Sequence, residues 1–169
     1  MARRRLVPFF ITERKAKNPS RRAPRYKVAL VKDAGSIYVT AKPIKQPAMI
    51  VPQLHELFED IDREAFYIVM LDQGSRVIGV NLVSVGTLSS SLVHPREVFK
   101  AAILLNSASI IAVHNHPSGS PEPSGHDRTL TDRLDKAGEL LGIPLKDHIV
   151  VGDPEGFPTY FSFKEQGIL

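Results

Sequence analysis

The sequence contains no cysteine and no tryptophan among its 169 residues. The absence of cysteine excludes disulfide bonds, thiolate metal ligands and a thiol nucleophile. Any bound metal ion must therefore be held by histidine, aspartate or glutamate side chains. A chain of this length with 43% hydrophobic residues can bury the core of one compact domain.

A long hydrophobic run is also missing. The longest apolar stretch, AAILLNSASIIAV, is interrupted by Asn106, Ser107 and Ser109, so it is unsuited to a transmembrane helix. The basic start, MARRRLVPFFITERKAK, has an apolar patch that is too short for a signal peptide and has no small-residue cleavage site after it. We therefore expect a cytoplasmic protein without a membrane association.

Positive charge is concentrated at the start of the chain. Residues 1–27 hold ten lysines or arginines and one acidic residue, Glu13, for a local net charge of +9, whereas the rest of the chain carries −5. The sequence predicts a flexible basic arm over 1–25. Residues 1–27 can bind nucleic acid non-specifically or serve only to keep the protein soluble.

A short β extension over 26–50 and one domain over 51–169 are expected to follow.

Apolar periodicity predicts a mixed α/β fold, with a β-sheet flanked by helices. The turn residues Asp72-Gln73-Gly74-Ser75 separate two apolar runs that should form an antiparallel hairpin. The expected strands are 26–32, 36–40, 65–71, 76–85, 109–113, 145–151 and 159–163. The expected helices are 52–61, 95–106 and 125–141.

Two histidines follow the apolar run 109–113. Residues two apart on a strand point to the same side, so His114 and His116 should leave the strand end in parallel and reach one cation. Pro117 ends this strand, because proline cannot donate a hydrogen bond to the sheet.

An aspartate follows at the start of the next predicted helix. Ser124 stands at the expected N-cap, which places Asp127 in the first turn, where the helix dipole favours a carboxylate. Taken alone, either residue is an ordinary capping residue. Together with His114 and His116, Asp127 completes a three-ligand zinc site whose open position is typical of catalytic zinc.

These residues resemble a known family. H-x-H-x7-S-x-x-D is the core of the JAMM (MPN+) metalloprotease motif, and HNHPSG, VHPREVFK and DHIVVGD are similar to the RadC branch. The resemblance covers residues 65–169. It implies a cytidine-deaminase-like α/β fold, zinc bound by His114, His116 and Asp127, and a metallopeptidase-type activity. It also implies that Ser124 stabilises the oxyanion formed on the substrate carbonyl.

The family motif also requires an upstream glutamate that moves a proton from the attacking water to the leaving amine. At the aligned position this sequence has Asn81, whose amide cannot accept that proton. Glu97 and Glu122 are alternative bases, although surface or capping roles suit both. Asp147 and His148 suit two roles equally well. They can form hydrogen bonds to the metal-ligating histidines, or they can form a buried hydrogen-bonded pair with each other.

Two functions are compatible with this pattern. The first is a zinc-dependent hydrolase that acts on amide or isopeptide bonds of a protein or peptide. The second is a zinc-binding module that has lost turnover, because Asn81 replaces the glutamate, and that associates with nucleic acid through its basic arm. The RadC name is linked to DNA repair, but no residue pattern here indicates a repair reaction.

Overall fold

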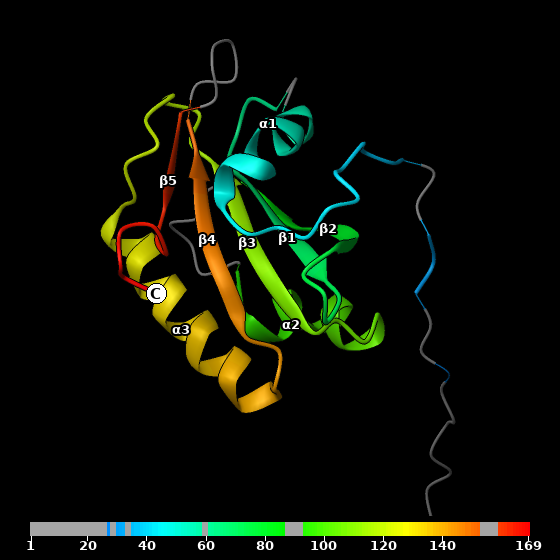
Figure 1. The fold of residues 1–169 in the computed structure, drawn as a ribbon. Coiled ribbons are helices and arrows are strands. Elements are labelled where there is room, and N and C mark those ends of the chain that lie inside the picture. Colours follow the sequence, from blue (N-terminus) through cyan, green and yellow to red (C-terminus); the bar gives the residue numbers. More distant parts are fainter. Residues whose placement is uncertain (1–26, 28–29, 33–34, 59–60, 87–92, 153–158) are drawn as a thin grey trace, which may run out of the picture.

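A five-stranded mixed sheet forms the centre of the protein (Figure 1). The computed structural model describes residues 27, 30–32, 35–58, 61–86, 93–152 and 159–169. The strand order is β2-β1-β3-β4-β5; β3 and β4 run parallel and the other neighbours are antiparallel. The strands are β1 (Ala65–Leu71), β2 (Val77–Val85), β3 (Ser109–Asn115), β4 (Leu145–Val151) and β5 (Tyr160–Ser162).

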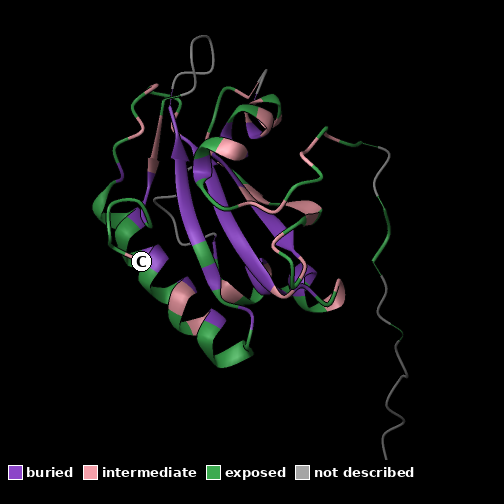
Figure 2. Cartoon of the chain, viewed as in Figure 1, coloured by how far each residue is buried: buried purple, intermediate pink, exposed green. Residues whose placement is uncertain are grey.

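Helices pack against both faces of the sheet. On one face, α2 (Pro95–Leu104) and α3 (Gly125–Leu141) bury Val98, Phe99, Leu130 and Leu134 against β1 and β3. The other face is covered by the short α1 (Val51–Leu54) between the 3-10 turns η1 (Pro47–Met49) and η2 (His55–Leu57). Strand β3 is buried along its whole length (Figure 2). The predicted mixed α/β class is therefore confirmed.

Helix α3 begins and ends as its sequence indicates. Ser124 caps the N-terminus and forms a reciprocal capping box with Asp127. Gly142 ends the helix in the left-handed conformation, with φ 68°, which glycine adopts without steric cost. This fixed start matters for function because it orients Asp127.

Two predictions for the N-terminal part are wrong. Residues 36–40 form no strand, and neither do residues 27 and 30–32 of the predicted strand 26–32. No neighbouring strand pairs with residues 36–40; instead the Thr40 N–H donates to the Gln53 side chain at 2.8 Å. The predicted helix 52–61 is also shorter, because α1 ends at Leu54 and continues as a 3-10 turn.

Some predictions lie outside the described residues, among them the basic arm over 1–25. The domain boundaries at 25 and 50 stay predictions. Within the described part of the chain, no helix is both long enough and apolar enough to cross a membrane.

Close contact between the end of α3 and the start of β4 requires glycine at position 138. A Cβ atom built there would lie 2.7 Å from the carbonyl oxygen of Ile143 and 3.2 Å from the amide nitrogen of Leu145. We predict that Gly138→Ala lowers the free energy of unfolding by about 1–3 kcal/mol, since backbone atoms must shift. The matched control is Gly125→Ala in the first turn of α3, where a Cβ atom meets nothing within 4 Å. Urea denaturation of both variants tests this; equal losses of stability would contradict it.

Candidate metal centre

The end of β3 places two histidines beside each other. His114 lies opposite Phe66 of β1, on the sheet face covered by α2 and α3, and is fully buried. His116 follows one residue after the strand, where its N–H donates to the Val151 carbonyl of β4 at 3.1 Å. Asp127, 1% exposed, approaches the same point from the first turn of α3. The structure therefore brings together the three predicted metal ligands.

The spacing of these side chains suits a small tetrahedral ion. The two Nε2 atoms of His114 and His116 lie 3.2 Å apart. The carboxylate oxygens of Asp127 lie 3.3 Å from Nε2 of His114 and 3.5 Å from Nε2 of His116. Ligand atoms bound to one tetrahedral zinc at about 2.0–2.2 Å lie roughly 3.3–3.6 Å from one another. These three residues can therefore hold one metal ion.

Each of the two histidines forms a hydrogen bond through Nδ1, which leaves the lone pair on Nε2 available to bind a metal ion. His116 donates from Nδ1 to the carbonyl oxygen of Ser120, at 2.8 Å, so a neutral His116 has its lone pair on Nε2. His114 has the same orientation, with its Nδ1 2.9 Å from Nε2 of the buried His148.

The direction of the His114–His148 hydrogen bond follows from a chain that ends on a backbone carbonyl. The Thr131 hydroxyl donates its one hydrogen to the carbonyl oxygen of Asp127 at 2.6 Å, and therefore accepts from Nδ1 of His148 at 2.7 Å. Burial lowers the pKa of His148 to about 4, so this ring is neutral and its Nε2 accepts from His114. The lone pair of His114 is thereby left on Nε2, facing Asp127.

The charges of the cluster agree with a cation-binding site. Burial, and then the neighbouring His148, keep the pKa of His114 well below its usual range, so this imidazole is neutral. Burial opposes ionisation of Asp127, but hydrogen bonds from His116 and Ser124 outweigh it and lower the pKa of the carboxyl. In the absence of a metal ion, a proton on Nε2 of His116 lies between that imidazole and the Asp127 carboxylate. A metal ion that replaces this proton meets two imidazole lone pairs and one carboxylate.

Ser124 contacts the carboxylate of Asp127 directly. Its hydroxyl donates to the carboxylate at 2.6 Å and its backbone N–H donates to the same oxygen at 2.7 Å. The hydroxyl therefore lies at the edge of the ligand cluster. Its predicted oxyanion role stays a prediction.

Aromatic rings hold the two buried histidines in place. Phe66 stacks on His114 with ring centroids 5.9 Å apart, and Phe163 stacks on His148 at 5.1 Å. Asp147 instead accepts hydrogen bonds from the Ser162 hydroxyl and the Lys164 backbone. Of the two residues whose roles the sequence left open, His148 thus contacts a metal ligand and Asp147 ties β4 to the segment that contains β5.

The structure also brings to the cluster an acidic residue that the sequence analysis missed. Glu64 directly precedes β1, and the antiparallel register that pairs Phe66 with His114 carries Glu64 toward His116. The pKa of His116 is raised mainly by its hydrogen bond to Asp127 and, to a smaller degree, by the charge of Glu64. Glu64 therefore lies close enough to His116 for its charge to act on that imidazole.

Asn115 holds the backbone on both sides of Glu64. Its side-chain oxygen accepts from the Ala65 N–H at 2.7 Å, and its amide group donates to the Arg63 carbonyl at 3.2 Å. The Glu64 carbonyl itself accepts from the Gly86 N–H at 2.8 Å. The side chain of Asn115 thus extends the pairing of β1 with β3 up to the metal cluster.

Asn81, which the alignment puts at the glutamate position, lies on another strand. Asn81 is on β2 and pairs with Ile68, whose partner on β3 is Ala112, two residues before His114. Two strand spacings, about 9–10 Å, separate β2 from β3, so the Asn81 amide does not reach the ligands. The assignment of Asn81 to the glutamate position stays a prediction, and Glu64, which directly precedes the strand paired with β3, is an alternative to it.

The other two candidates are surface residues. Glu97 pairs with Arg96 and Lys100 on the exposed side of α2. Glu122, whose side chain is 71% exposed, pairs with Arg128 at 3.5 Å. The surface role that the sequence suggested for each is confirmed.

A cluster of three possible metal ligands on a mixed α/β sheet makes this chain a candidate metal-binding protein. Its sequence matches the RadC-like JAB domain family over residues 44–168. The chain belongs to this family, as its motifs predicted.

Curated relatives of this chain carry the name UPF0758 protein. It is 44% identical over 153 residues to a UPF0758 protein of Desulfitobacterium hafniense, an alignment that covers 88% of this chain and 65% of the relative. It is 50% identical over 126 residues to a UPF0758 protein of Rubrobacter xylanophilus, covering 75% of this chain and 53% of the relative. The chain thus spans about half to two thirds of the length of these curated relatives.

We predict that His148 supports metal affinity by fixing the orientation of His114. His148→Leu removes the acceptor for the His114 N–H and should weaken zinc binding about 10–100-fold, as is usual for such supporting residues. His148→Gln retains a side-chain oxygen as acceptor and should lose less affinity. Competition with a fluorescent chelator measures both variants. Equal zinc affinity in wild type and His148→Leu would refute this role.

Proposed function

We propose that this domain is a zinc-dependent hydrolase of amide or isopeptide bonds in a protein or peptide substrate. The observation that carries the proposal is the convergence of His114, His116 and Asp127, together with a fourth group, Glu64, whose charge acts on His116 and which is not one of the three ligands. A site with three protein ligands and a nearby carboxylate has the composition of hydrolytic zinc centres.

Each protein group has a definite task in this proposal. Zinc, when bound, lowers the pKa of a coordinated water and polarises the substrate carbonyl. Glu64 accepts a proton from the attacking water and delivers it to the leaving nitrogen. Asn115 keeps Glu64 in position through the backbone on either side. The Ser124 hydroxyl, which donates to the Asp127 carboxylate in this structure, turns its one hydrogen to the substrate oxygen as negative charge develops there.

The alternative, an inactive zinc-binding module, depended on Asn81 in the place of the catalytic glutamate. Glu64 weakens that reason, because its carboxylate acts on His116. Nucleic-acid binding by residues 1–27 remains a separate proposal, since only Lys27 of that segment is described.

We predict that Glu64→Gln reduces hydrolysis by about 10²–10⁴-fold while zinc affinity changes little, because an amide cannot accept the proton. The matched control is Glu139→Gln, the same change at an exposed position near the end of α3. Asn81→Ala should retain the wild-type rate. The measurement is cleavage of an isopeptide-linked peptide at equal zinc occupancy. A fully active Glu64→Gln variant, or loss of activity in Asn81→Ala, would show that the proton carrier is another residue.

A further inference from the structure

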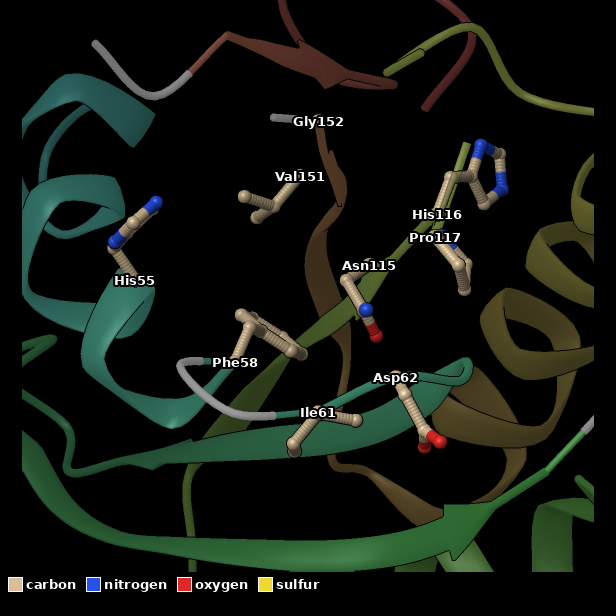
Figure 3. A pocket seen from close by; sticks show the side chains of 9 residues that line it. All are labelled: His55, Phe58, Ile61, Asp62, Asn115, His116, Pro117, Val151 and Gly152. Atoms are coloured by element: carbon tan, nitrogen blue, oxygen red, sulfur yellow. The ribbon is translucent and has the colours of Figure 1, made fainter. Parts of the chain in front are cut away.

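A small cavity lies on the other side of the strand end that carries the metal ligands. Its volume is about 120 Å³. Figure 3 shows His55 on one side of it and Asn115, His116 and Pro117 on the other. Val151 and Gly152 of the β4 end lie above in this view, and Phe58, Ile61 and Asp62 lie below. His116 therefore belongs both to the wall of this cavity and to the metal cluster.

The walls of the cavity are mainly apolar. Phe58 and Val151 are 2% exposed, and Ile61 and Pro117 add further hydrocarbon. Both ends of the Asn115 amide are engaged by the backbone of Arg63 and Ala65, so this wall residue has a satisfied polar group. An apolar side chain is therefore the chemical group that this space suits.

One polar atom of a residue that lines the cavity lacks a partner. Within the described part of the chain, only two buried side-chain polar atoms have no hydrogen bond, and Nε2 of His55 is one of them. Water does not reach this nitrogen, so it lies behind the cavity wall and is not offered to an occupant. The His55 ring therefore contributes to the cavity as a packing surface and not as a hydrogen-bonding group.

We propose that this cavity binds an apolar side chain of a peptide substrate, one of leucine size, next to the bond that is cleaved. An apolar cavity of roughly 150 Å³ accommodates benzene, so a space of about 120 Å³ accepts a somewhat smaller group. The position relative to the scissile bond follows from His116, which joins the cavity to the metal cluster. The identity of the occupant as a substrate rests on the proposed hydrolase function, whereas binding to the cavity does not.

Binding is tested without catalysis. Wild-type protein labelled with ¹⁵N is titrated with N-acetyl-leucine N-methylamide and, as the matched ligand, N-acetyl-alanine N-methylamide. The leucine probe should shift the amide signals of Phe58 and Gly152 and bind about tenfold or more tightly than the alanine probe, because three additional carbons are buried. Equal binding of both probes, or shifts confined to other parts of the protein, overturns the proposal.

Variants connect the binding to this cavity. Ile61→Trp fills the space from a half-buried position and should abolish leucine-probe binding while zinc affinity is retained. Ile78→Trp, the same change on the exposed side of β2, should bind like wild type. Unchanged probe affinity in Ile61→Trp overturns the assignment of the cavity.

Cleavage assays separate this proposal from the proposed function. Peptides that differ only by leucine or alanine beside the scissile bond should differ in kcat/KM by about tenfold or more. Probe binding at the cavity without hydrolysis of any peptide would leave the binding site in place and refute the hydrolase. Hydrolysis without a preference for leucine, and without probe binding, would support the hydrolase and refute the binding site.

Discussion

The alternation of side chains at the end of β3 is the constraint on which the rest of the site depends. His114 and His116 point to one face of the sheet and are two of the three possible metal ligands. Asn115 lies between them, and its side chain instead pairs with the backbone around Glu64. A shift of one residue in the register of this strand would exchange these roles, because the period of a strand is two. The ligands and the proposed base are therefore positioned by the same short segment.

A second constraint is the direction of the buried hydrogen bonds. A backbone carbonyl can only accept, so the Asp127 carbonyl fixes the Thr131 hydroxyl, which fixes His148, which fixes His114. The carboxylate of the same Asp127 binds on the other side of His114. One residue thus sets the orientation of an imidazole and supplies the ligand next to it. This series of hydrogen bonds requires a neutral His148 ring, and burial keeps the ring neutral by lowering its pKa.

The sequence predicted the features of this site that depend on local structure. The shared face of His114 and His116 follows from strand periodicity, and the place of Asp127 follows from the cap at Ser124. Glu64 was missed because it comes near His116, 52 positions later in the sequence, only through the pairing of β1 with β3. An acidic residue directly before a predicted strand was the available signal. The strand expected at 36–40 failed for a related reason, since its alternation did not reveal that no neighbour pairs with it.

The central claim is that His114, His116 and Asp127 bind one zinc ion and leave a position open. X-ray absorption of the zinc-loaded protein, combined with metal analysis, tests this most directly. The account predicts one zinc per chain, two imidazole nitrogens at about 2.0–2.1 Å and oxygen in the remaining positions. It also predicts that a His114→Ala/His116→Ala variant retains no zinc. Equal zinc content in this variant and the wild type, or a spectrum with more than two imidazoles, would contradict the account.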